Sequence, residues 1–354
     1  MTVRVTLSVS KICGTGSNFF SRVLTQRTAG PLSNNPEDVR PPSTERRGLV
    51  PFITDYYGIK GPVPFANVDV ASDNFLFLDP HAVRLTGAPQ PFAGEALHCV
   101  DTFLAEIVRC VISPAPADRR RGEALLQRFK EPWETRLGMS TKGYHGHGGA
   151  EDVGTWIWTA LTTDLAALVH VGVLERLEDL PMFVAGIDRD ITSDVTTRIM
   201  YAALARFTES MLAKYPEFTA DGHKVKTVTS QVWDPSKLEW TEEQFTLPVA
   251  DGKPLLLVPT AWTRRNLLMS ATRFYEKTVL DFAQIERAVM GSDGKLIKTP
   301  KDELAKIKGL GRGRSTNVRL TLEAFEKNEN LIAYFKAFVA FKFERPEEDD
   351  SAAA

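Results

Sequence analysis

The sequence predicts an α/β or α+β fold in which a mixed sheet is flanked by helices and followed by a helical C-terminal region. β-prone runs occur in separated clusters, segments with apolar residues at helical spacing lie between them, and nearly everything after Ser270 has helical character. The 354 residues are 43% hydrophobic and 25% charged, which is ordinary for one large domain or two smaller ones. We therefore expect an α/β core over 1–290, a helical region over 291–346 and a mobile acidic tail over 347–354.

The first part of the chain is expected to contain short strands. Alternating apolar residues over 3–9 predict a half-buried strand, whereas the Pro-, Ser- and Asn-rich segment 25–47 is expected to be a mobile insertion. Two β-prone runs, 66–70 and 75–78, flank a segment of turn-forming residue types at 71–74. These two runs are therefore predicted to form a β-hairpin.

Helical spacing dominates the middle of the chain. Apolar residues recur every three or four positions over 96–111, a more exposed helix is predicted over 117–129, and a long apolar helix over about 153–177. The run 182–185 is interpreted as a buried strand that leads into one long helix over 195–211. Further strands are predicted at 224–232 and 255–258.

Composition restricts the class of protein. The net charge of −2 means that contact with a nucleic acid would have to come from a local basic patch. Three scattered cysteines, with no CxxC pair, indicate reduced thiols and a cytoplasmic protein. No run approaches the roughly 18 apolar residues of a membrane helix, so no membrane partner is expected.

The C-terminal region contains a short motif with two glycines. Leu304, Ile307, Gly309, Gly311 and Ser315 follow the order apolar, apolar, glycine, glycine, small. This pattern resembles the hairpin of a helix-hairpin-helix motif, although the proline common before the first glycine is absent. The resemblance implies that the glycines let the backbone approach a DNA phosphate, which amides at the start of the second helix bind.

Local charge supports the same interpretation. Between residues 295 and 314 there are seven basic residues and two acidic ones, in a chain that is slightly acidic overall. The candidate DNA-binding residues are Lys308, Gly309, Gly311, Arg312 and Arg314. A glycine-rich connector between two surface helices explains the pattern equally, and that alternative remains open.

An acidic cluster follows the predicted strand at 182–185. Three carboxylates in the loop after a strand could bind Mg²⁺, which prefers hard oxygen ligands. The candidate metal ligands are Asp188, Asp190 and Asp194. The alternative is helix capping, in which Asp190 or Ser193 accepts hydrogen bonds from the first exposed amides of a helix, and an acidic first turn complements the helix dipole.

Titratable residues also gather around a glycine-rich loop over 143–149. His145 and His147 lie two positions apart, so in extended backbone their rings would face the same side and could share a metal or a phosphate. With Glu134 they are the candidate catalytic residues, against the alternative of a surface loop. Asp251-Gly252-Lys253 has the Asp-x-Lys spacing of some nucleases, but Asp-Gly before a strand is more typical of a tight turn.

The segments 134–138, 186–194 and 255–259 together resemble uncharacterised bacterial proteins of phage-defence or mobile-element neighbourhoods. The resemblance implies a DNA-associated protein of a bacterial defence-type system. With the acidic cluster it points to a metal-dependent phosphodiesterase or nuclease that uses Mg²⁺. The alternative function is a non-catalytic subunit that binds other protein subunits, and the sequence leaves both open.

Overall fold

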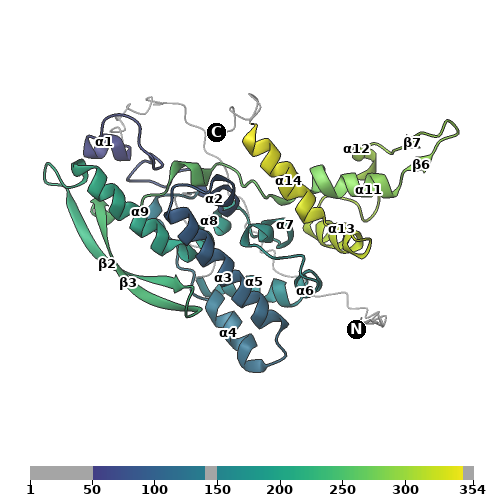
Figure 1. Cartoon of the computed structure of the whole chain (residues 1–354), viewed down its shortest axis with the longest axis horizontal. Coiled ribbons are helices and arrows are strands. Elements are labelled where there is room, and N and C mark those ends of the chain that lie inside the picture. The colour runs from purple at the N-terminus through teal and green to yellow at the C-terminus, as the bar shows by residue number, and fades with distance from the viewer. Residues whose placement is uncertain (1–50, 140–149, 346–354) are drawn as a thin grey trace, which may run out of the picture. The chain divides into compact units, whose positions relative to one another are not determined.

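The computed structural model describes residues 51–139 and 150–345, which form an α+β protein with small antiparallel sheets among many helices (Figure 1). The predicted fold class, with helices flanking the sheet and a helical C-terminal region, is confirmed. The described residues belong to one compact unit. The predictions for 3–9, 25–47 and 347–354 lie outside the described residues.

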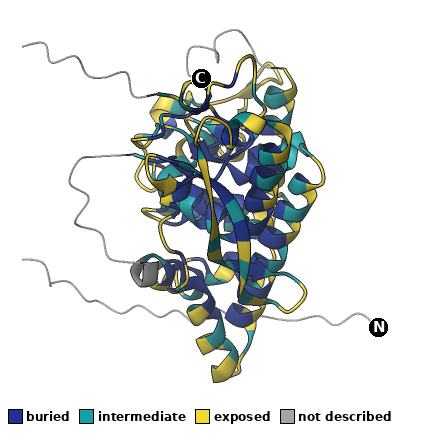
Figure 2. Cartoon of the chain, turned by 90° about the vertical axis from the view of Figure 1, so that its left-hand side faces the viewer, coloured by how far each residue is buried: buried dark blue, intermediate teal, exposed yellow. Residues whose placement is uncertain are grey.

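The largest helices form the centre of the core. Helix α3 (Phe92–Ile112) buries an apolar stripe against α4 (Pro116–Leu126) and α9 (Tyr201–Lys214). Helix α4 also lies directly against α5 (Ala150–Thr162), because a Cβ at Gly154 would come within 2.2 Å of the Leu126 carbonyl oxygen. Figure 2 shows the buried residues gathered in the interior and the exposed residues on the outside.

One long hairpin forms most of the sheet. Strand β2 (Lys224–Asp234) pairs antiparallel with β3 (Glu239–Ala250), and β4 (Lys253–Pro254) adds a short third strand. The aromatic rings at the closed end of this hairpin pack on α3, with Trp233 and Phe103 at a centroid distance of 5.0 Å. The buried end of the hairpin is therefore anchored in the helical core.

A buried carboxylate connects α3 to α4. Glu106 is only 4% exposed, and its two oxygens accept hydrogen bonds from Arg109 and Arg121. These arginine contacts, with Arg109 the stronger, lower the pKa of Glu106 to about 2 against the opposing effect of burial. The side chain is thus held as an ion pair inside the helical layer.

The C-terminal region is built on helices that return to the core. It contains α10 (Ala271–Phe274), a π-helical turn (Tyr275–Val279), α11 (Leu280–Glu286), the strand pair β6 (Val289–Met290) and β7 (Leu296–Ile297), α12 (Lys301–Leu304), α13 (Arg314–Glu326) and α14 (Leu331–Glu344). Helix α13 packs on α7 (Leu180–Phe183), where Asn317 Nδ2 donates to the Met182 carbonyl oxygen at 2.9 Å.

The remaining elements are short. They are α1 (Ile53–Tyr57), β1 (Phe77–Leu78), α2 (Pro80–Thr86), α6 (Ala166–His170), α8 (Arg189–Ile199), β5 (Thr263–Arg264) and single 3₁₀ turns at Trp133–Thr135, Leu177–Asp179, Pro216–Phe218 and Thr260–Trp262. No helix in the described ranges is long and apolar enough to cross a membrane.

Several predicted elements differ from those observed. The hairpin over 66–78 is wrong, because β1 pairs with β5 instead of with the preceding run. The run 182–185 forms no strand: Met182 and Phe183 end the short helix α7, which has Pro181 in its first turn, and the next two residues form a bend and a turn. Residues 255–258 make no strand, the helix expected over 153–177 ends at Thr162, and the one expected over 195–211 divides at Met200. The strand pair β6–β7 was not predicted.

Candidate functional site

The segments that carried the resemblance lie beside one another in the fold. The backbone of Asn74 contacts the segment 134–138. Its amide donates to the Arg136 carbonyl oxygen at 2.8 Å, and its carbonyl oxygen accepts from the Gly138 amide at 3.0 Å. The Met139 amide donates to Asp190 Oδ1 at 3.3 Å, and the Leu256 amide donates to the Glu134 carbonyl oxygen at 2.8 Å. Residues far apart in sequence thus form one connected region, in which 134–138 and 255–259 are buried.

Asp188 acts as the N-cap of α8. Its Oδ1 accepts from the amides of Asp190 at 3.1 Å and Ile191 at 3.4 Å, and its backbone is extended, as an N-cap requires. Capping therefore occurs here, but at Asp188 instead of at Asp190 or Ser193, because α8 begins at Arg189, earlier than the sequence predicted.

Asp190 and Asp194 lie one turn apart on α8 and share an acidic environment. Burial raises the pKa of Asp190, and the amide of Met139 opposes that rise only in part. Burial raises the pKa of Asp194 well above its usual value, and the negative charges of Asp190 and Glu131 raise it further. The Asp194 carboxyl therefore keeps its proton to a higher pH than an exposed aspartate.

The three aspartates do not meet as a set of metal ligands. Within 51–139 and 150–345, no three His, Cys, Asp or Glu side chains lie close enough together to hold one ion. Asp188 is directed at helix amides, while Asp190 accepts a hydrogen bond from the Met139 amide. Mg²⁺ usually keeps several waters and needs only one or two carboxylates, so the Mg²⁺ site stays a prediction from the sequence.

Glu134 is part of an ion pair. Its side chain is buried, and Oε2 accepts from Arg198 Nη2 at 3.2 Å. The same guanidinium donates to the carbonyl oxygens of Lys130 and Glu131, so it closes the turn before the 3₁₀ helix. Glu134 therefore positions backbone in this structure, and the candidate catalytic residues His145 and His147 lie outside the described residues.

The glycine motif forms an open turn between α12 and α13. Leu304 and Leu310 are buried, whereas Gly309 is exposed with a φ of 87°. The carbonyl oxygens of the turn are occupied, since Tyr275 Oη donates to that of Leu310 at 2.5 Å and Thr316 Oγ1 to that of Gly311 at 2.7 Å. In the described part of the chain, the amides of Gly309 and Gly311 donate no hydrogen bond.

The basic residues of this turn have different environments. Lys306 and Lys308 are exposed and form no ion pair with any residue that the structure describes. Arg312 pairs with Glu276. Arg314 is half-buried and donates to the carbonyl oxygens of Pro181 and Ile187 in the core, so it holds α13 in place instead of facing a ligand.

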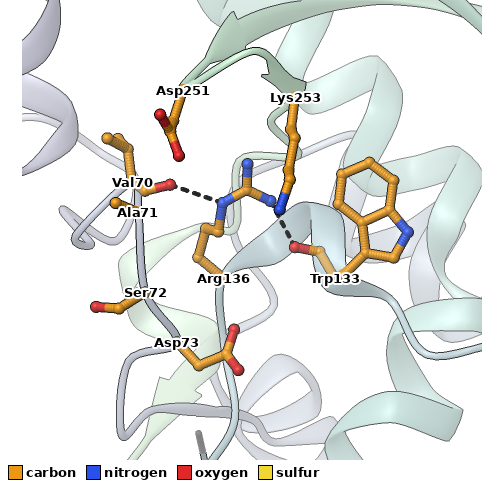
Figure 3. A pocket seen from close by; sticks show the side chains of 8 residues that line it. All are labelled: Val70, Ala71, Ser72, Asp73, Trp133, Arg136, Asp251 and Lys253. Atoms are coloured by element: carbon orange, nitrogen blue, oxygen red, sulfur yellow. Dashed lines mark hydrogen bonds between the residues drawn. The ribbon is translucent and has the colours of Figure 1, made fainter. Parts of the chain in front are cut away.

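A pocket of about 330 Å³ lies where the segments 70–73, 133–136 and 251–253 meet, and the sequence did not predict it. Its lining comes from three segments: Val70, Ala71, Ser72, Asp73, Trp133, Arg136, Asp251 and Lys253 (Figure 3). The turn interpretation of Asp251-Gly252 is correct, with φ values of 49° and 71° at the β3–β4 connection. The signal that could have led to the pocket is Lys253 next to that turn, but nothing in the sequence places Arg136 beside it.

The protein thus has an α+β fold in which the segments 70–74, 133–139 and 188–194 lie close together. Residues 60–270 match the model of a family described as a domain of unknown function, DUF8370. Because the match spans more than half of the chain, the protein belongs to this family. No curated protein and no solved structure matches the chain. The matched range includes the pocket and ends before the turn between α12 and α13.

Proposed function

We propose that the protein binds DNA through the phosphate backbone, with the turn between α12 and α13 as the contact. The observation that supports this is the pair of glycine amides, on Gly309 and Gly311, that donate no hydrogen bond within the described residues. A phosphate accepts hydrogen bonds from such amides, and the positive end of a 13-residue helix adds favourable electrostatics. The setting in a bacterial defence-type system is part of the proposal and rests on the resemblance alone.

Open space at the turn also supports backbone contact. A Cβ built on Gly311 would meet no protein atom nearer than 3.8 Å, and one on Gly309 none nearer than 4.0 Å. The exposed ammonium groups of Lys306 and Lys308 stand on the same turn and would neutralise phosphate charge. Two free lysines imply a modest salt dependence, with a slope of roughly two in log affinity against log salt concentration.

The decisive variant is Gly311→Val. The φ of Gly311 is not in the left-handed region and a Cβ there has room, so the fold should tolerate a valine at this position. The valine side chain would fill the space that a phosphate would enter. We expect weaker binding to DNA of any sequence, measured by fluorescence anisotropy with a labelled 30-base-pair duplex. Lys308→Gln should reduce the salt slope by about one unit, because one phosphate contact is lost.

The matched control is Lys226→Gln, an exposed lysine on β2 away from the turn, which should leave both affinity and salt slope unchanged. Thermal midpoints of all variants confirm folding. If Gly311→Val and Lys308→Gln bind DNA as the unmodified chain does, the turn is a connector and the proposal is wrong. Metal-dependent cleavage of the bound DNA stays a prediction from the sequence.

A second candidate function, binding of another protein subunit, is favoured by the strand pair β6–β7. Its four apolar side chains, Val289, Met290, Leu296 and Ile297, are between 56% and 68% exposed, and apolar surface of this kind is common at protein interfaces. Met290→Asp with Ile297→Asp should then abolish a defined complex isolated from native cells and leave DNA binding intact. Loss of DNA binding in this double variant would argue against a separate protein interface.

A further inference from the structure

We propose that the pocket beside Arg136 binds a nucleotide, with its phosphate at Arg136 and Lys253 and its base on Trp133. This ligand site is separate from the turn between α12 and α13, so nucleotide binding and DNA binding can be tested independently of each other.

The first argument is the environment of the Arg136 side chain. It is 5% exposed, its Nε donates to the Val70 carbonyl oxygen at 2.9 Å, and its Nη1 donates to the Trp133 carbonyl oxygen at 2.6 Å. Its Nη2 is buried and has no hydrogen-bond partner in the described residues. Burial also lowers the pKa of Arg136, since no carboxylate contacts it directly. A buried guanidinium N–H group without a hydrogen-bond acceptor destabilises the folded state, and a bound ligand could supply that acceptor.

The second argument is the arrangement of charges around the pocket. Lys253, Asp73 and Asp251 line it with Arg136, and among the described residues none of these four forms an ion pair. Asp73 and Asp251 lie on opposite sides of the Arg136 side chain (Figure 3), so they do not converge on one cation. Two positive and two negative groups give a pocket with no net charge. A ligand that matches it carries an anionic group and also hydrogen-bond donors.

The third argument is the aromatic wall. Trp133 is 44% exposed at the pocket, and the Arg136 guanidinium lies 5.7 Å from the centroid of its ring. Exposed tryptophan rings offer a surface on which a nucleobase stacks. The volume of about 330 Å³ lies within the range of small-molecule sites. A nucleotide provides a phosphate for the cations, sugar hydroxyls or base amines for the carboxylates, and a flat ring for the indole.

The backbone presents Arg136 in a way that favours a functional role. Its φ of 57° is in the left-handed region, which is unfavourable for a residue other than glycine. The conformation is maintained by the hydrogen bonds of Asn74 to the Arg136 carbonyl oxygen. The fold therefore holds this guanidinium at the pocket at some cost to stability.

The test is calorimetric titration of the full chain with AMP, adenosine and inorganic phosphate. We expect AMP to bind at least tenfold more tightly than either adenosine or phosphate. Lys253→Gln should weaken AMP binding by about tenfold or more, because a charge-assisted contact is lost at an exposed side chain that stabilises nothing else described. Trp133→Leu should weaken AMP binding and leave phosphate binding unchanged.

Arg136→Lys is the direct variant, but it also removes hydrogen bonds that hold the loop at Val70, so Lys253→Gln decides the outcome. Lys226→Gln is the matched control and should bind AMP as the unmodified chain does. Gly311→Val should also bind AMP normally, which separates this site from the DNA contact. The proposal is overturned if AMP does not bind at millimolar concentration, if Lys253→Gln binds it unchanged, or if adenosine or phosphate alone binds equally well.

Discussion

Asn74 holds the loop that forms one wall of the pocket, and its replacement by alanine should destabilise the protein measurably. Its Oδ1 accepts from the Asp69 amide at 2.9 Å, and its Nδ2 group donates to the carbonyl oxygens of Asp69, Ser72 and Arg136 at 3.0–3.1 Å. One acceptor and two N–H donors amount to about three hydrogen bonds. At about 0.5–1.5 kcal/mol each, with the side chain only partly buried, Asn74→Ala should lower the free energy of unfolding by about 2–3 kcal/mol.

The measurement is urea unfolding followed by tryptophan fluorescence, with a thermal scan alongside. A loss of that size corresponds to a drop of roughly 3–4 °C in the thermal midpoint for a chain of this length. The m-value should stay constant, because the loop changes little of the surface exposed on unfolding. Ser72→Ala is the matched control, since Ser72 Oγ makes one exposed hydrogen bond to Asp69 Oδ2. It should cost less than about 1 kcal/mol.

Replacement of Asn74 should also affect the ligand site. Because Asn74 maintains the backbone of Arg136, Asn74→Ala should weaken AMP binding even at temperatures where the variant is fully folded. An unfolding free energy within about 0.5 kcal/mol of the unmodified chain would refute this account of the loop, since substitutions without structural consequence fall in that range.

Two further predictions concern pH. Glu106, with its pKa lowered to about 2, stabilises the fold above its unfolded pKa of about 4.5 and loses that contribution as the pH falls toward 2. Glu106→Gln should therefore cost about 1–3 kcal/mol in urea unfolding at pH 7, with the difference shrinking in acid; a constant difference would contradict the ion pair. Asp194 has the opposite sign, because its raised pKa makes ionisation unfavourable in the folded state as the pH rises above 3.8. Asp194→Asn should raise the thermal midpoint at pH 8 and leave it unchanged near pH 3, and a lower midpoint at pH 8 would show that the carboxylate is stabilising.

Regular apolar spacing allowed the long helices to be predicted. The stripe over 96–111 identifies α3 because one face of a helix repeats every three or four residues and the core selects for that face. The short apolar run at 182–185 could not be assigned in the same way, because four buried residues fit either a strand or a helical turn. The pairing of β1 with β5 joins residues almost 190 positions apart, and local turn chemistry carries no information about such a contact.

The candidate site was predictable only in part. The sequence predicted helix capping in this segment but placed it at Asp190 or Ser193, because the helix was expected to begin several residues after its actual start at Arg189; the observed N-cap is Asp188. The pocket could not be predicted, because Asp73, Arg136 and Lys253 come from separate segments with no motif between them. Arg314 shows the reverse case: its sequence position suggested a ligand contact, but tertiary packing directs its guanidinium to carbonyl oxygens of the core.

The packing of α13 and α14 on the 60–270 region has a consequence for modularity. Asn317 Nδ2 donates a hydrogen bond to the Met182 carbonyl oxygen. Lys336 Nζ forms an ion pair with the buried Asp179 carboxylate at 2.9 Å. A chain cut at residue 270 would keep the matched family region, yet it would expose the apolar face of α7 and leave the Asp179 carboxylate without its cation. The matched range 60–270 is therefore not a segment that covers its own apolar surface. We expect a chain that ends at residue 270 to need another segment or subunit to cover α7.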